Sequence, residues 1–377
     1  MDLPHFLMLW LGGTTLAYLL QRAYHEFRWG AFNRANAHLE RGCFEEALVA
    51  AEAASKRFPK DWRFHFTAAK ACIEMQDPEE ALAYFRKAEE LVAETPIELL
   101  INRAIAKSML LDYEGALGDI NRALQSKQQR LWALLARSYI YHDEYNYQAA
   151  LDDCNEALNL RATCEAYICR CGVYIGLNNL EAARADLQSL SEHLSKDARP
   201  SLVALSLHLQ ASLLSFDGLF VEAAEEQSKA IELAPQDPFH YINRAYFLSA
   251  ARQLEEALSD LESADKLAKT KLAHSYIASN RARISIMRDD LDTALQLANE
   301  AVAIYERPGI LCTRAAIFLL TGALKEAERE LERAQQLNPF DMEIYWWKGR
   351  LMEALGREIE AQQNKEKALE GHYKPYF

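Results

Sequence analysis

The chain has 377 residues, half of them apolar, and its 42 basic and 55 acidic residues leave a net charge of −13. An acidic balance of this size argues against nucleic acid as the main partner, because phosphate binding needs a basic face. The length would accommodate about two or three globular domains, so the internal organisation has to be followed along the chain.

The N-terminal segment from Leu3 to Leu20 is apolar and carries no charge. Eighteen helical residues measure about 27 Å, near the lower limit for crossing a bilayer. Positive charge follows at Arg22 and Arg28, which by the positive-inside rule places the rest of the chain in the cytoplasm. The sequence therefore predicts a single-pass membrane protein with its anchor in residues 1–27. The spanning segment would include Leu3, Trp10, Leu11, Leu16 and Leu20. The alternative is an apolar helix that caps the rest of a cytoplasmic protein.

Beyond the N-terminal segment, a pair of alanines seven residues apart recurs at intervals of 33 to 40 residues. Seven residues are two helical turns, so both alanines lie on one helix face and allow a neighbouring helix to approach closely. A tenth unit, Ala183/Leu190, keeps only the first alanine. The nine complete pairs are Ala47/Ala54, Ala81/Ala88, Ala116/Ala123, Ala150/Ala157, Ala223/Ala230, Ala257/Ala264, Ala294/Ala301, Ala327/Ala334 and Ala361/Ala368.

Another small residue precedes each pair, by 12 positions in nine of the ten units. This constant offset predicts one helix, a short turn and the start of a second helix. The exception is Ala136, which lies 14 positions before Ala150 and therefore predicts two extra residues in the loop 142–146.

These residues resemble the tetratricopeptide repeat (TPR) superfamily, for example in units 69–88, 245–264 and 315–334, with Phe85 at the large-residue site between the alanines. The resemblance covers residues 28–375. It implies an all-α, right-handed superhelical solenoid of about ten helix–turn–helix repeats. Because Leu190 replaces an alanine and the next interval is stretched to 40 residues, we predict a loop insertion near 191–202. The alternative is a hinge, or a longer helix, between two arrays.

The sequence offers no motif for catalysis or for a cofactor. The seven cysteines form no Cys-x-x-Cys pair, the ten histidines form no His-Glu-x-x-His motif, and no phosphate-binding glycine loop is present. We therefore predict no catalytic residues, no metal site and no cofactor.

The resemblance implies that the first helix of each repeat lines a concave groove, and that the residue after the small packing position projects into it. Four of these ten residues are basic, although the chain is acidic. We hypothesise a positively lined groove that binds an extended acidic segment or a C-terminal carboxylate of another protein. The alternative is that the basic side chains pair with neighbouring acidic helices. The candidate groove residues are Asn36, Arg63, Lys70, Asn102, Arg130, Arg137, Tyr246, Arg283 and Arg350.

The sequence thus predicts a non-catalytic protein-interaction scaffold that recruits or assembles partner proteins at a membrane through its concave groove. The alternative is a soluble regulatory adaptor, or a chaperone-like TPR protein, whose N-terminal segment is a capping helix.

Overall fold

The computed structural model describes residues 26–195 and 198–375, which contain helices and no strand. They form ten antiparallel helix pairs, one for each predicted repeat, so the predicted all-α solenoid is confirmed. The first pair joins the helix at residues 26–40 to α2 (Phe44–Arg57). The other pairs are α3 (Trp62–Glu74) with α4 (Pro78–Glu89), α5 (Ile97–Met109) with α6 (Tyr113–Leu124), α7 (Arg130–Asp143) with α8 (Tyr147–Leu160), α9 (Cys164–Gly176) with α10 (Leu180–His193), α11 (Pro200–Phe216) with α12 (Phe220–Leu233), α13 (Pro238–Ala250) with α14 (Leu254–Leu267), α15 (Lys271–Met287) with α16 (Leu291–Ile304), α17 (Pro308–Leu320) with α18 (Leu324–Leu337), and α19 (Met342–Ala354) with α20 (Glu358–Glu370).

The turn inside each helix pair is built in the same way. One residue per turn adopts a positive φ, the left-handed conformation that commonly ends a helix. Four turns use glycine at this position and six use another residue, at an energetic cost that the packing of the pair offsets. In chain order the ten residues are Gly42, Gln76, Leu111, Tyr145, Asn178, Gly218, Arg252, Asp289, Gly322 and Gly356.

The fourth repeat corrects one expectation. Its turn has the ordinary length, with Tyr145 at the positive-φ position, so the two extra residues predicted for the loop 142–146 are absent. The small packing residue is Ser138, which is 0% exposed and lies 12 positions before Ala150. Its hydroxyl donates to the Ala150 carbonyl at 3.0 Å, which lets a polar side chain occupy an alanine site. The sequence pattern missed Ser138 because the corresponding position in the other repeats is alanine, cysteine or glycine.

Five repeats share an ion pair between their two helices. In each, an arginine on the first helix binds a buried carboxylate 16 residues later on the second helix, with N–O distances of 2.6–2.7 Å. We call these pairs the intra-repeat clips. Removing one partner of such a pair is costly, because the other charge stays buried. The clips are Arg103–Asp119, Arg137–Asp153, Arg170–Asp186, Arg244–Asp260 and Arg314–Glu330.

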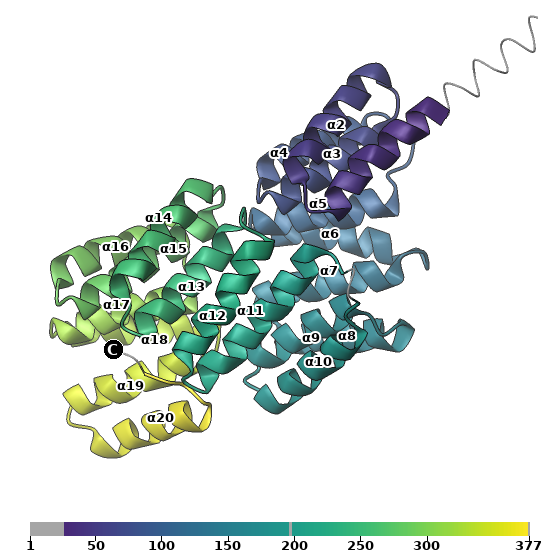
Figure 1. Cartoon of the computed structure of the whole chain (residues 1–377). Coiled ribbons are helices and arrows are strands. Elements are labelled where there is room, and N and C mark those ends of the chain that lie inside the picture. Colours follow the sequence, from purple (N-terminus) through teal and green to yellow (C-terminus); the bar gives the residue numbers. More distant parts are fainter. Residues whose placement is uncertain (1–25, 196–197, 376–377) are drawn as a thin grey trace, which may run out of the picture.

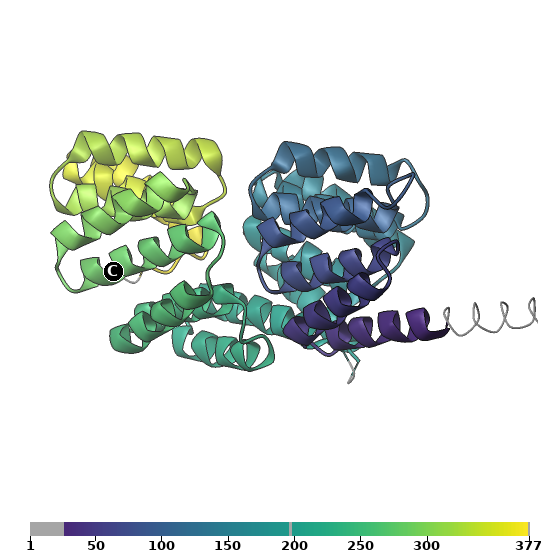
Figure 2. The same ribbon diagram turned by 90° about the horizontal axis from the view of Figure 1, so that it is seen from above.

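The superhelix turns back far enough for its two halves to meet. Helices α2–α10 form one stack and α13–α20 a second stack beside it, with α11 and α12 joining them (Figures 1 and 2). The region 191–202 contains the passage between the stacks, since α10 ends at His193 and α11 begins at Pro200. Hinge motion at this passage stays a prediction.

The predicted membrane topology is not supported. Within residues 26–195 and 198–375, every helix falls short of the length or the hydrophobicity that a bilayer crossing requires. Helices α11 and α15 have 17 residues each, fewer than the roughly 20 that a spanning helix needs. This finding overturns the prediction of a single-pass membrane protein. The segment on which that prediction rested, including Leu3, Trp10, Leu11, Leu16 and Leu20, lies outside the described residues.

Candidate functional site

The predicted groove arginines of the N-terminal half are engaged in ion pairs. Arg63 binds both oxygens of Asp61, the residue that caps its own helix, at 2.7 and 2.8 Å. Arg130 lies 2.6 Å from Glu156, and Arg137 belongs to an intra-repeat clip. Their positive charges are therefore balanced within the protein.

The remaining predicted residues of this half differ in their surroundings. Asn36 accepts a hydrogen bond from the Thr67 hydroxyl at 3.5 Å, and Asn102 donates to a carbonyl of its own helix at 2.8 Å. Lys70 has no carboxylate within 4 Å among the described residues, and burial lowers the pKa of its ammonium group. Of the predicted basic residues, Lys70 thus keeps the least compensated charge.

The C-terminal half brings two predicted residues together. The guanidinium of Arg283 lies 5.7 Å from the ring centre of Tyr246, across neighbouring first helices. Both residues line a cavity of about 310 Å³, which we call the C-terminal groove. The third arginine predicted for this half, Arg350, lies outside it and pairs with Glu353 at 3.5 Å. The other lining residues are Phe239, Ile242 and Asn243 of α13, Tyr276, Ser279 and Asn280 of α15, Gly309 and Ile310 of α17, and Glu343 of α19.

Arg283 is buried in the wall of the C-terminal groove rather than extended into solvent. Its guanidinium donates to both carboxylate oxygens of Glu343 at 2.9 and 3.0 Å and to the Thr313 hydroxyl at 2.8 Å. Asn280, only 8% exposed, donates to the Tyr276 carbonyl at 2.9 Å, but its own Oδ1 has no hydrogen-bond partner in the described structure. A buried acceptor without a donor is costly, so this oxygen is a candidate contact for a ligand N–H group.

A second cavity, of about 230 Å³, shares Tyr246 and Glu343 with the C-terminal groove. We call it the aromatic cavity. It lies between the two stacks, because Tyr147, Ile175, Gly176 and Asn178 come from the fourth and fifth repeats and the rest of its lining from later ones. The full lining is Tyr147, Ile175, Gly176, Asn178, Phe216, Tyr246, Asn338, Phe340, Asp341, Met342, Glu343 and Tyr373.

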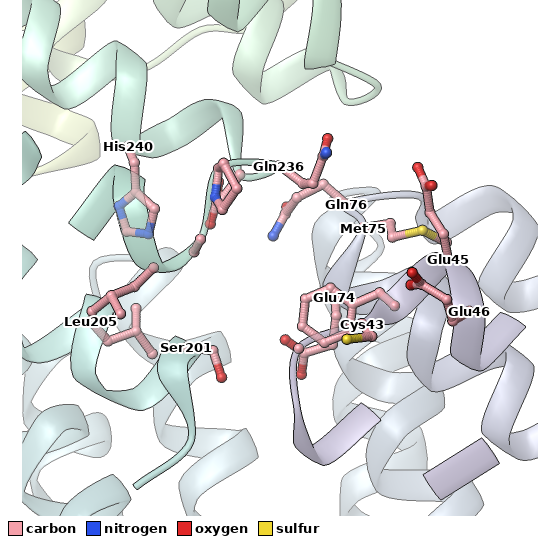
Figure 3. A pocket seen from close by; sticks show the side chains of 16 residues that line it. Cys43, Glu45, Glu46, Glu74, Met75, Gln76, Ser201, Leu205, Gln236 and His240 are labelled. Atoms are coloured by element: carbon pink, nitrogen blue, oxygen red, sulfur yellow. The ribbon is translucent and has the colours of Figure 1, made fainter. Parts of the chain in front are cut away.

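A third cavity, of about 440 Å³, separates the first two repeats from the sixth and seventh. Figure 3 shows Glu45, Glu46 and Glu74 on one wall, facing Leu205 and His240 on the other. We call this cavity the acidic cleft. Burial raises the pKa of Glu74, since desolvation disfavours its charged form, and lowers the pKa of His240 to about 4. The acidic cleft therefore places several carboxyl groups opposite an imidazole whose protonated form is disfavoured.

The two stacks are joined on this inner side by a buried arginine. Arg307, at the start of α17, donates to the Asp143 carbonyl at 2.9 Å and the Tyr145 hydroxyl at 2.8 Å, and it also binds the Asp143 carboxylate. The Tyr113 hydroxyl donates to the same carboxylate. We call this set of contacts the inter-stack latch. It connects residues 162 and 164 positions apart and so joins the fourth repeat to the ninth.

Sequence reasoning missed the acidic members of these sites. Asp341 is the N-cap of α19 and Glu343 lies in its first turn, and the sequence analysis assigned neither of them a role. Burial and the neighbouring charge of Glu343 raise the pKa of Asp341 to about 7. Nothing in the repeat pattern marks these carboxylates, because their proximity to Tyr147 and Asn178 depends on closure of the superhelix.

Comparisons with known proteins agree with this architecture. Residues 32–96 match the family model described as tetratricopeptide repeat. The tetratricopeptide repeat protein 36 homolog of Drosophila melanogaster is 36% identical over 110 residues, which are 28% of this chain and only 59% of that relative's length. Human IFIT1, solved as a dimer with PPP-AAAA, has a TM-score of 0.54 at 16% identity, with 97% of this chain and 88% of that chain covered.

A tetratricopeptide repeat protein from Parabacteroides merdae gives a TM-score of 0.45 at 19% identity over 68% of this chain and 99% of that chain. At such identities, the likeness to solved structures is one of fold alone. Residues 32–96 are thus similar to the tetratricopeptide repeat family, and the described chain as a whole is a solenoid of ten helix pairs.

Proposed function

We propose that this chain is a regulatory adaptor that binds an extended segment of a partner protein in the C-terminal groove. TPR folds generally bind other proteins, and their curved stacks offer long concave surfaces for this purpose. The observation that carries the proposal is Asn280, whose buried Oδ1 lacks a hydrogen-bond donor beside a groove of about 310 Å³. A backbone N–H of an extended segment would supply that donor.

The charge of the partner segment is a separate matter. The hypothesis of an acidic segment relied on free basic residues, and Arg283 is already paired with Glu343 in this groove. The preference for an acidic segment therefore stays a prediction. The Arg283–Glu343 pair argues against it, because the positive charge of Arg283 is already compensated. We also do not extend the PPP-AAAA ligand of IFIT1 to this chain, because a phosphate needs uncompensated positive charge.

Site-specific photo-crosslinking tests the proposal. A benzoylphenylalanine placed at Tyr276, which lines the groove, is expected to form crosslinks to partner proteins in an extract of the native cells. The same probe at Val221, which is half exposed on α12, is the matched control outside the groove. Adding the substitution Asn280→Leu to the Tyr276 probe should reduce its products. Identical products from both probe positions, or none from position 276, would contradict binding in this groove.

A further inference from the structure

The aromatic cavity has a composition that differs from the rest of the concave face. Five aromatic side chains line it, drawn from α8, α11, α13, the turn before α19 and the segment after α20. Aromatic faces attract organic cations through the ring quadrupole, and the attraction grows when the site is desolvated. The five side chains are Tyr147, Phe216, Tyr246, Phe340 and Tyr373.

The cavity also holds a carboxyl group that forms no ion pair within the described residues. Its lining includes Asp341 and Glu343 but no lysine, arginine or histidine among the described residues. Arg283 neutralises Glu343. Asp341 accepts the backbone N–H of Glu343 at 3.0 Å, yet it has no cation within 4 Å in the part of the chain that the structure describes. Burial raises its pKa, which is the sign of a carboxylate that its surroundings do not fully stabilise.

An independent observation concerns the opposite wall. The Oδ1 atom of Asn178 is buried and has no hydrogen-bond donor in the described structure. Asn178 holds the positive-φ position of its turn. The cavity therefore offers two acceptors on walls from different stacks, Asp341 and Asn178, and a ligand that supplies several donors would satisfy both.

The walls are set close by small residues. A Cβ added at Gly176 would collide with the ring of Tyr147, and one added at Gly371 would collide with Met342. The ring of Tyr147 is further held by the Asn338 amide, which donates to its hydroxyl at 3.4 Å, and by an edge contact with Phe340 at 5.8 Å. A volume of about 230 Å³ has room for the end of one long side chain.

We propose that the aromatic cavity binds the guanidinium group of an arginine side chain from a partner protein. The guanidinium would pair with the Asp341 carboxylate, donate one N–H to Asn178 Oδ1 and stack its plane on the aromatic rings of the lining. Arginine fits better than lysine, because its planar fork carries five donors and stacks on aromatic rings, whereas an ammonium is a compact, strongly hydrated charge. The carboxylates of the acidic cleft, also between the stacks, would favour the approach of a basic segment.

That the guanidinium belongs to a partner protein rests on the proposed function, whereas the binding of a guanidinium group by the cavity does not. Free n-butylguanidinium tests the cavity without any partner, and n-butylurea is its neutral counterpart of similar shape. Saturation-transfer NMR on the full chain is expected to give a signal for n-butylguanidinium at least about tenfold stronger than for n-butylurea. A heptapeptide with one central arginine, compared with its citrulline and lysine versions, tests the peptide as the source. We expect the arginine peptide to bind at least tenfold more tightly than the citrulline peptide, with the lysine peptide in between.

Asp341→Asn is the decisive variant, since asparagine is also a good helix N-cap and the fold of α19 should survive. It should remove most of the preference for the charged probe. Asp112→Asn, at the N-cap of α6 and outside this cavity, is the matched control and should change nothing. Equal signals for n-butylguanidinium and n-butylurea, or an unchanged preference in Asp341→Asn, would overturn the site. Binding of n-butylguanidinium without a peptide preference would overturn only the assignment to a partner protein.

Discussion

Substituting Arg307 by alanine should open the superhelix. Its side chain is 5% exposed and binds Asp143, whose side chain is 19% exposed, together with the Tyr145 hydroxyl. Breaking a buried ion pair typically costs about 3–5 kcal/mol. Because Asp143 keeps some contact with water and the Tyr113 hydroxyl, we expect a loss near the lower end, about 3 kcal/mol. The loss falls on the closed arrangement of the stacks, since each repeat is stabilised mainly by its neighbours.

Small-angle X-ray scattering should therefore show a larger radius of gyration for Arg307→Ala, and hydrogen exchange should quicken in residues 141–147. The control is Arg184→Ala, which removes an ion pair to Asp217 in which both side chains are more than 40% exposed. An exposed pair contributes roughly 0–1 kcal/mol, so this variant should keep the closed shape. If Arg307→Ala scatters like the wild type and unfolds at the same urea concentration, the inter-stack latch does not hold the stacks together.

Three further outcomes follow from the buried groups. Arg137→Ala should lower the free energy of unfolding in urea by about 2–3 kcal/mol, because it leaves Asp153 buried and unpaired. Arg137→Lys should recover only part of this loss. A loss below about 0.5 kcal/mol in Arg137→Ala would contradict the role of the clip. Because the pKa of Asp341 is raised in the folded state, the free energy of unfolding of the wild type should fall as the pH rises from about 4 to about 7. Asp341→Asn should be more stable than the wild type by on the order of 2 kcal/mol at pH 8.5 and equally stable near pH 4. Parallel pH profiles of the urea midpoint for the two proteins would refute this. Four thiols are fully buried, and burial raises their pKa: Cys72, Cys154, Cys171 and Cys312. Ellman's reagent at pH 8 should therefore modify them only after unfolding. Their rapid modification in the native protein would contradict the described packing.

The repeat architecture could be predicted because it depends on local spacing. The distance between Ala81 and Ala88, and the offset to the small residue before them, are fixed by helical geometry within one helix pair. Ser138 was not predicted as a packing residue because serine is polar, although its hydroxyl donates to a carbonyl and the side chain fills an alanine site. Because Ala136 was taken as the packing residue in its place, two extra loop residues were expected and Arg137 was predicted to face the groove. In the structure Arg137 forms the intra-repeat clip with Asp153.

The geometry of the candidate site could be anticipated only in part. Tyr246 and Arg283 both follow the packing residue of adjacent repeats, and the structure brings them within 5.7 Å of each other, but their role in binding stays a prediction. The partner of Arg283, Glu343, lies 60 residues away, and no periodicity announces it. The inter-stack latch and the aromatic cavity arise from the summed rotation of many repeats, and a small change per repeat would separate Arg307 from Asp143. Such long-range proximity is a property of the superhelix as a whole.

The intra-repeat clips have a consequence for how the protein is made. Each clip joins residues 16 positions apart, so a helix pair such as α5–α6 can complete its own charge pairing soon after leaving the ribosome. Contacts across about 160 residues, such as Arg307 with Asp143, can form only after the chain has been synthesised as far as the start of the ninth repeat. Folding should therefore proceed by sequential formation of the helix pairs, followed by docking of the two stacks through the inter-stack latch.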